Sequence, residues 1–307
     1  MSPNHVAEDL PLTRDTAQDI LDVTIVGPDD FRFNSGSGNH LGNVHGGRLI
    51  GQSLYAAMLT VERMPATSVQ GNFLAAGRIG RPIEYHVERL RDSRRFANRQ
   101  VIARQDGQAI FVALCEFHDP EPGFTHQDAV MPDVPAPESL VPLQHFVRDN
   151  AAQIAEAAIS NFSGPLPIEM RVIEPERYLI RRARKPRRLF WFRLPSAAAI
   201  SDPRLHQCLI AFSSDYWLAG VAAVPHGLPT NNPELIISSL NHAIWFHRPG
   251  RCDEWLLHHT TGPTAGDGIG HSQGHIYDRT GRLLASTAQS GLLRVTAGKA
   301  AGAASHS

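Results

Sequence analysis

The chain has 307 residues, of which 42% are hydrophobic and 19% charged, so it contains enough apolar material for a substantial core. Its formal net charge of −1 gives no electrostatic reason to expect a nucleic acid or an anionic membrane as the main partner. The three cysteines, Cys115, Cys208 and Cys252, are too widely spaced to predict a disulfide framework or a paired-cysteine zinc site.

The first third of the chain predicts one long helix followed by antiparallel strands. Residues up to about Asp29 predict an arm with one short helix. Apolar residues at three- and four-residue steps after Gly46 and Gly47 predict a helix that Pro65 closes. Strand-like segments follow at 69–74, 83–90, 96–105 and 109–117, and Asp106-Gly107 predicts a hairpin turn between the last two.

A proline-rich stretch, 119–143, predicts a segment draped over the surface, and a helix is expected at 151–158. Ser213 and Ser214 offer N-cap hydroxyls for a buried helix over 216–224. The remaining expected elements are a disordered tail at 297–307 and strands at 168–172, 189–193, 235–240, 243–247, 255–259, 274–277 and 283–294.

The sequence reads as one unit repeated. Phe73 and Phe246 are 173 positions apart, and Gly107 and Gly281, each in an expected turn, are 174 apart. A nearly constant offset at two landmarks indicates the duplication of one structural unit. The first copy begins at His45-Gly46-Gly47-Arg48 and the second at Phe212-Ser213-Ser214-Asp215.

Only the second copy carries a set of groups suited to hydrolysis. Asp215, Ser239 and Gln289 supply a carboxylate, a hydroxyl and an amide that can converge on one water molecule. Asp215 at the start of a helix would be an ionised general base, and backbone N–H groups at that helix N-terminus would stabilise an oxyanion. This chemistry requires no metal and no organic cofactor.

Several dispersed motifs, from about Phe31 to Arg294, follow one another in the order of a known family. The segment 241–249, Asn-His-Ala-Ile-Trp-Phe-His-Arg-Pro, is similar to the histidine-tryptophan-phenylalanine-histidine-arginine-proline strand of the type-II acyl-CoA thioesterases. Segments 209–215 and 285–292 resemble the family's serine-aspartate helix start and its closing strand with the catalytic glutamine. Gly46, Gly47 and the segment 51–57 are similar to its first helix.

This resemblance implies an α+β double hotdog fold, in which two tandem units each wrap an antiparallel sheet around a long helix. The sheets of the two units are expected to pair into one pseudo-dimer. The expected divisions are an N-terminal unit with its arm at 1–118, a connecting segment and helix at 119–165, a C-terminal unit at 166–296 and the tail at 297–307.

The resemblance also implies roles for individual residues. Asp215 and Gln289 would hold the attacking water, with Ser239 at a position where the family usually has a threonine. The substrate-binding residues expected are Gly47, His242, Trp245 and Phe246, the last two as core or as walls of an acyl pocket. The sequence departs from the family pattern at Asn241, Ser290 and Ile269, which bears on the substrate and the reaction more than on the fold.

Two other functions remain open. One is an enoyl-thioester hydratase or dehydratase, because Asp202-Pro203-Arg204-Leu205-His206 faintly resembles a hydratase motif. The other is a catalytically lapsed protein that binds an acyl thioester. The simpler alternatives for single residues are a helix cap for Asp215 and ordinary strand positions for Ser239 and Gln289. The histidines give no convincing metal site.

The expected partner is an acyl-CoA substrate, and neither a nucleic acid nor a membrane span is expected. The basic run 181–188 is expected to be a solvated loop, with contact to coenzyme A as an alternative. Association into a homo-oligomer is expected. Because the chain lacks a signal-peptide pattern and Ser305-His306-Ser307 differs from a serine-lysine-leucine peroxisomal address, a cytoplasmic location is expected.

Overall fold

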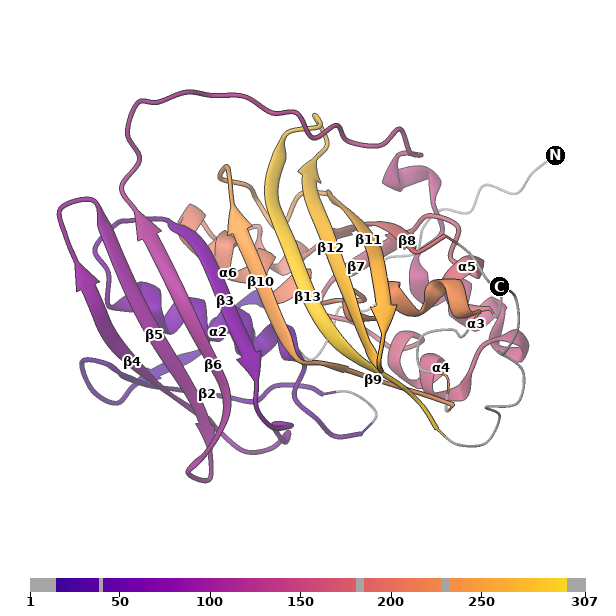
Figure 1. Ribbon diagram of the computed structural model, residues 1–307, viewed down its shortest axis with the longest axis horizontal. Helices are drawn as coiled ribbons and strands as arrows, with labels where there is room; N and C mark the ends of the chain where they lie inside the picture. The colour runs from indigo at the N-terminus through magenta and orange to yellow at the C-terminus, as the bar shows by residue number, and fades with distance from the viewer. Residues whose placement is uncertain (1–14, 39–40, 181–184, 228–231, 233, 297–307) are drawn as a thin grey trace.

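The computed structural model describes residues 15–38, 41–180, 185–227, 232 and 234–296. Its strands form one 13-stranded sheet with antiparallel neighbours, and its two central helices lie behind that sheet in the view of Figure 1. The α+β architecture expected from the sequence is therefore confirmed. The predicted disordered tail, 297–307, lies outside the described residues.

The first unit is built around α2 (Gly46–Leu59), which buries most of its side chains. Gly107, together with Asp106, has a positive φ in the turn between β5 and β6, as a two-residue hairpin of Asp-Gly type requires. The other elements of this unit are α1 (Ala17–Leu21), β1 (Val23–Ile25), β2 (Asp30–Phe33), β3 (Ala66–Phe73), β4 (Ile83–Asp92), β5 (Phe96–Gln105) and β6 (Gln108–His118).

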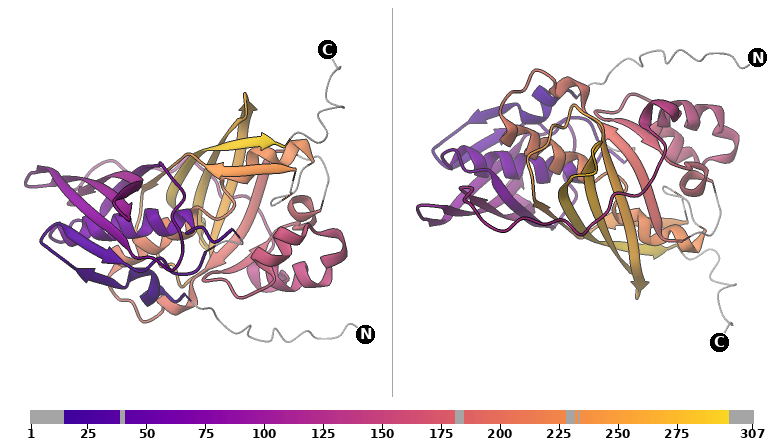
Figure 2. Two further views of the ribbon diagram at one scale, coloured as in Figure 1. Left: turned by 90° about the horizontal axis from the view of Figure 1, so that it is seen from below. Right: turned by 90° about the horizontal axis from the view of Figure 1, so that it is seen from above.

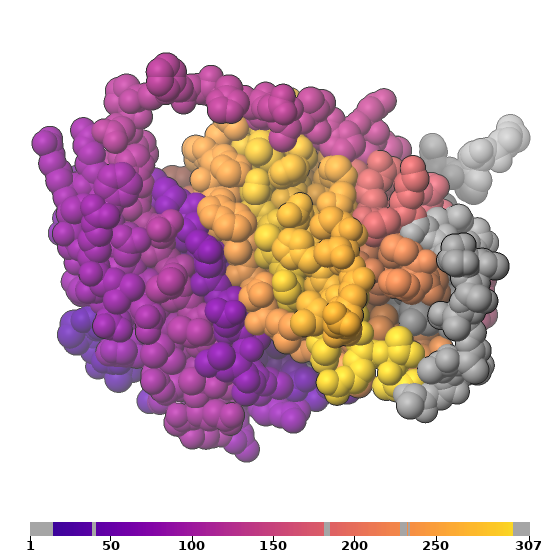
Figure 3. Space-filling model, viewed as in Figure 1, coloured from indigo at the N-terminus to yellow at the C-terminus, as the bar shows by residue number. Residues whose placement is uncertain are grey.

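Residues 119–136 contain no helix or strand and arch over one end of the sheet toward the second unit (Figures 1 and 3). The helix expected at 151–158 is wrong in its bounds, because the chain forms a short 3-10 turn and then a helix that starts later. The elements of this region are η1 (Pro137–Ser139), α3 (Leu143–Asp149), η2 (Ala151–Gln153) and α4 (Glu156–Phe162).

The second unit contains the other central helix, α6 (Pro203–Ser214). Its further elements are β7 (Glu169–Val172), α5 (Glu176–Leu179), β8 (Arg187–Arg193), η3 (Pro195–Ala197), η4 (Ala219–His226), β9 (Leu235–Ser239), β10 (Asn241–Phe246), β11 (Leu256–Gly266), β12 (Ile269–Asp278) and β13 (Leu283–Val295).

The helix expected over 216–224 is wrong in position and type. The α-helix ends at Ser214, and the expected span holds only the 3-10 helix η4. The start of α6 follows strong local signals, since the side chain of Asp202 accepts a hydrogen bond from the Arg204 N–H and Pro203 occupies the first turn. By length and composition Pro203–His226 could cross a membrane, but 83% of its apolar window is buried inside the fold, as in a core helix.

The two units meet at the centre of the sheet. The strand order is β1-β2-β4-β5-β6-β3-β10-β13-β12-β11-β8-β7, with β9 paired to β13. Five residue pairs join β3 to β10, and the middle pair is Gln70 with Ala243, which are 173 positions apart. This is the offset between Phe73 and Phe246, so a near two-fold axis passes through the central strand pair. Figure 2 shows the first unit, in indigo and purple, beside the second unit, in orange and yellow.

Candidate active site

The three predicted catalytic residues come together between the second unit's helix and its sheet. The Gln289 side-chain amide donates to Asp215 Oδ1 at 2.7 Å and to Ser239 Oγ at 2.8 Å. Because Ser239 in β9 pairs with Gly291 in β13, it is a diagonal neighbour of Gln289 on the same face. Gln289 is fully buried and the Asp215 side chain is 7% exposed, so the amide holds both oxygens in fixed positions.

The helix N-terminus beside Asp215 belongs to the first unit, which corrects the expected placement. Asp215 is the C-cap of α6 and does not begin a helix. A Cβ on Gly46, in the first turn of α2, would lie 2.7 Å from Asp215 Oδ2. The first N–H groups of α2 have no partner within the helix, and its N-cap, His45, makes no side-chain cap hydrogen bond. The carboxylate therefore lies in the positive field of a helix contributed by the other unit.

Two histidines flank this carboxylate. His45 Nε2 lies 3.6 Å from Asp215 Oδ2, and its ring lies against Tyr216 with a centroid separation of 4.2 Å. Burial lowers the pKa of His45, although the Asp215 charge opposes this effect. The sequence interpretation did not assign a role to His45; its position directly before Gly46 was the available signal.

His242, predicted to bind substrate, lies behind the carboxylate. Its Nε2 is hydrogen-bonded to Ser214 Oγ at 2.8 Å, and its Nδ1 lies 3.8 Å from Asp215 Oδ1. Burial lowers the pKa of His242 to about 4, so the ring is neutral at neutral pH. The side chain is 1% exposed, which makes it a support for Asp215 more than a contact for a ligand.

The other predicted substrate-binding residues are not all near the three catalytic candidates. Gly47 is near them, in the first turn of α2, where a Cβ would lie 2.0 Å from the carbonyl oxygen of Phe212. Phe246 ends β10, about 20 Å along the strands from Ser239, and lines a separate cavity. Trp245 points to the opposite face of β10 from His242 and is 37% exposed.

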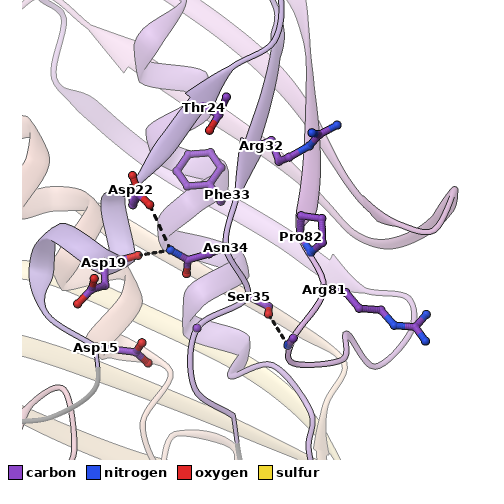
Figure 4. Close-up of a pocket in the computed structure, with 12 residues that line it drawn as sticks. Asp15, Asp19, Asp22, Thr24, Arg32, Phe33, Asn34, Ser35, Arg81 and Pro82 are labelled. Carbon is purple, nitrogen blue, oxygen red and sulfur yellow. Dashed lines mark hydrogen bonds between the residues drawn. The ribbon is translucent and has the colours of Figure 1, made fainter.

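Two cavities of the structure are lined by residues other than the three candidates. One, of about 610 Å³, lies beside α1 and β2 (Figure 4). Its polar groups bond to one another: the Asn34 amide donates to the Asp19 carbonyl and to Asp22, and Ser35 Oγ accepts from Gly80 N–H. The second cavity, of about 730 Å³, lies where the two units meet at the end of β10.

The basic run differs from the expected solvated loop at its end. Residues 181–184 lie outside the described part of the chain. Arg188 is 1% exposed, donates to the Trp217 carbonyl at 2.7 Å and lies against the Tyr178 and Trp217 rings. Burial lowers the pKa of Arg188 to about 10. Its guanidinium is therefore a core group and is not positioned for coenzyme A.

The hydratase-like segment has a structural role. Asp202 caps α6 and pairs with Arg204 at 2.8 Å. His206 is buried, and its two ring nitrogens are hydrogen-bonded to the Ile200 carbonyl and the Cys252 N–H. These two side chains do not form an aspartate–histidine pair. Within the described residues there is also no group of three histidines, cysteines or carboxylates that could hold a metal ion.

Two helix-and-sheet units joined edge to edge about a near two-fold axis define a double hotdog protein. Its candidate polar site lies where the N-terminus of α2 in the first unit meets the C-terminus of α6 in the second. A model of the acyl-CoA thioesterase N-terminal domain matches residues 35–118, and a model of the C-terminal domain matches residues 137–293. The chain belongs to the acyl-CoA thioesterase family.

Individual relatives cover most of the chain. Acyl-CoA thioesterase II TesB2 from Mycobacterium marinum is similar in structure, with a TM-score of 0.74, 32% identity and coverage of 92% of this chain and 98% of that one. Acyl-CoA thioesterase 2 of Haemophilus influenzae is 33% identical over 87% of this chain and 93% of its own length. Mouse acyl-coenzyme A thioesterase 8 is 33% identical over 81% and 80% of the two chains.

The dehydratase domain of PpsC from Mycobacterium tuberculosis also matches, with a TM-score of 0.51 and 12% identity. At that identity the likeness concerns the fold alone.

Proposed function

We propose that this acyl-CoA thioesterase cleaves a fatty-acyl or related thioester of coenzyme A with a water held by Asp215, Ser239 and Gln289. The observation that carries the proposal is the bonding of Gln289. Its amide nitrogen is fixed by Asp215 and Ser239, and its buried carbonyl oxygen Oε1 has no hydrogen-bond partner among the described residues. An O–H group of a water can donate to that oxygen while the other donates to the carboxylate.

The proposed reaction begins with proton transfer from this water to Asp215 as its oxygen attacks the thioester carbonyl carbon. The N–H groups of the first turn of α2 stabilise the resulting oxyanion, because they point at the place where negative charge develops. The intermediate then collapses with cleavage of the carbon–sulfur bond. The thiolate leaves and takes the proton from Asp215; a thiol with a pKa of roughly 8.5 needs little acid assistance.

The test removes the chemistry of each group in turn, and at Asp215 it does so at nearly constant size. Asp215→Asn retains an acceptor oxygen for Gln289 but removes the base, so thiol release from acyl-CoA should fall by about 10²-fold or more. Gln289→Ala and Ser239→Ala should each lower turnover at least tenfold. The melting temperature of Asp215→Asn should stay close to that of the wild type, because packing is preserved.

The measurement is thiol release across a series of acyl chain lengths, with hydration of an enoyl-CoA followed in parallel. Full activity in Asp215→Asn would refute the assigned base. Hydration without thiol release would favour the hydratase alternative, and equal inertness of wild type and variant would favour a lapsed binding protein. A cytoplasmic location and a homo-oligomeric state remain predictions.

A further inference from the structure

The strand register identifies the first-unit counterpart of Ser239. Ser239 lies opposite Gly291 in the second unit, as Ala66 lies opposite Phe117 in the first. Ser239 and Ala66 are 173 positions apart, and Gly291 and Phe117 are 174 apart. These are the offsets between the sequence landmarks of the two units. The hydroxyl of the catalytic site is therefore replaced by a methyl group in its counterpart.

The counterparts of Gln289 and of the α2 N-terminus differ in chemistry too. The offset of 174 along β13 makes Cys115 the counterpart of Gln289, and its thiol is buried with a raised pKa. The N-terminus of α6 is capped by the Asp202 carboxylate, and Pro203 in its first turn has no N–H group. The counterpart thus lacks the hydroxyl and the amide that Ser239 and Gln289 supply, and the first turn of α6 is already capped.

A cavity nevertheless occupies this position. The two central helices pack antiparallel, because Gly47 lies against the Phe212 carbonyl and Gly51 against the Cys208 carbonyl. The C-terminal end of α2 therefore meets the N-terminal end of α6, where the cavity of about 730 Å³ is lined by residues that include Ala66 and Pro203. Its volume is typical of small-molecule sites. In Figure 3 the connecting segment arches away from this end and leaves an opening beneath it.

The wall of this cavity combines apolar surface with more arginines than carboxylates. Phe246 and prolines contribute apolar surface, and the charged side chains are three arginines and two carboxylates, beside two histidines. Both carboxylates already have an arginine partner: Asp202 pairs with Arg204, and Glu121 pairs with Arg95, which does not line the cavity. Arg248 donates to two uncharged acceptors, Gln127 Oε1 and the Leu283 carbonyl. Arg63 has no ion pair within the described part of the chain. Two guanidinium groups thus remain for an anion.

We propose that this cavity is a second, non-hydrolytic binding site for an amphiphilic anion, an acyl chain that carries an anionic head group. The chain lies along Phe246, and the head group pairs with Arg63 and Arg248. Acyl-CoA and free fatty acid share this chemistry. The inference goes beyond the proposed function and holds whether or not Asp215 is the base.

A thiol placed in the cavity wall reports occupancy. The three natural cysteines are buried, and burial raises the pKa of each thiol, so a cysteine at position 67, which lines the cavity, becomes the reactive one. S-dodecyl-coenzyme A, a thioether that cannot be hydrolysed, and dodecanoate are the two probes. We expect one or both to slow iodoacetamide alkylation of Thr67→Cys at least tenfold, and the comparison identifies the head group preferred.

Matched variants separate the site from general protection. Ser93→Cys, exposed in the turn between β4 and β5, should be alkylated at the same rate with and without each probe. Arg63→Glu with Arg248→Glu should abolish protection of Thr67→Cys, whereas Arg94→Glu, exposed and outside the wall, should leave it unchanged. No protection by either probe would overturn the proposal, as would equal protection by coenzyme A without a chain or protection that survives both charge reversals. Thiol release, measured separately, tests the catalytic residues.

Discussion

The carboxylate of Asp215 has little room beside the first turn of α2. A side chain at Gly46 would come within 2.7 Å of Oδ2 and within 3.0 Å of the Phe73 ring. Gly46 does not have a positive φ, so the requirement for glycine is one of space and not of backbone conformation. Because this contact joins the two units, the first unit determines the position of the carboxylate that we propose as the general base, which the second unit supplies.

Gly46→Ala should therefore lower kcat by about 10²-fold, since displacement of a catalytic group by an ångström has an effect of that size. The fold should persist, because alanine is a better helix former than glycine. Gly123→Ala is the matched control, as a Cβ there meets nothing within 4 Å. Steady-state thiol release and thermal melting of both variants provide the test, and unchanged kcat in Gly46→Ala would contradict the assigned geometry.

Two departures from the family pattern lie in contact with each other. The Ser290 N–H donates to Asn241 Oδ1 at 2.9 Å, so the amide of Asn241 supplies an acceptor that a carboxylate there would also supply. Ile269, the third departure, is 47% exposed at the start of β12. None of the three makes a hydrogen bond to Asp215, Ser239 or Gln289 in the described structure.

The sequence predicts the three catalytic candidates, because motifs identify them, but it does not predict all their neighbours. Asp215, Ser239 and Gln289 lie in segments that resemble the family, and the structure brings them into direct hydrogen bonds. The contacts of Asp215 with His45 and Gly46 were not predictable, because they join positions about 170 residues apart in sequence. Local sequence patterns do not show which residues so far apart in the chain lie together in space.

At the scale of elements, α6 shows how competing local signals mislead. Asp202-Pro203 is a strong helix start, and the same residues also resemble part of a hydratase motif. Ser213 and Ser214, interpreted as N-caps, lie at the other end of the helix, where each hydroxyl bonds back to a carbonyl of the preceding turn.

Asp202→Ala should destabilise the protein by about 1 kcal/mol, the usual contribution of a carboxylate cap. Asp202→Asn is the control that separates the cap from the ion pair with Arg204, since asparagine caps as well as aspartate and carries no charge. We expect urea unfolding to show a lower midpoint for the alanine variant and nearly wild-type behaviour for the asparagine variant. Equal losses in both would assign the effect to the ion pair.

Strands were more predictable than helices because alternation survives along both units. The segments at 83–90 and 96–105 are close to the observed β4 and β5. The strands expected at 255–259 and 274–277 are shorter than the observed β11 and β12. Asp267 and Gly268 form the turn between them with positive φ, another Asp-Gly pair. Alternation is weak beside that turn, where Gly262, Gly266 and Gly270 leave few side chains to follow.

At the scale of the whole molecule, buried neutral histidines should make stability depend on pH. Burial lowers the pKa of His242 to about 4 and of His258 to about 3, whereas an unfolded histidine titrates near 6.5. Between these values the unfolded chain binds more protons than the folded one. The free energy of unfolding should therefore be largest above pH 6.5 and fall as the pH decreases toward 4.

Urea unfolding between pH 4.5 and 7.5 tests this dependence. Carboxylates with lowered pKa values, such as those of Asp202 and Asp278, add a loss of stability mainly below that range. His242→Asn should flatten the slope relative to the wild type, whereas His126→Asn, at an exposed position in the connecting segment, should not. A slope of opposite sign would show that the buried rings are protonated in the native protein.

The chain segment that arches from β6 to η1 has an evolutionary consequence. In an assembly of two identical subunits, every mutation appears twice, so both clefts must keep or lose their machinery together. A covalent tether frees each half to change alone, while it keeps the halves at high effective concentration. One end of the helix pair can thus retain a reactive centre while the other drifts toward recognition without turnover.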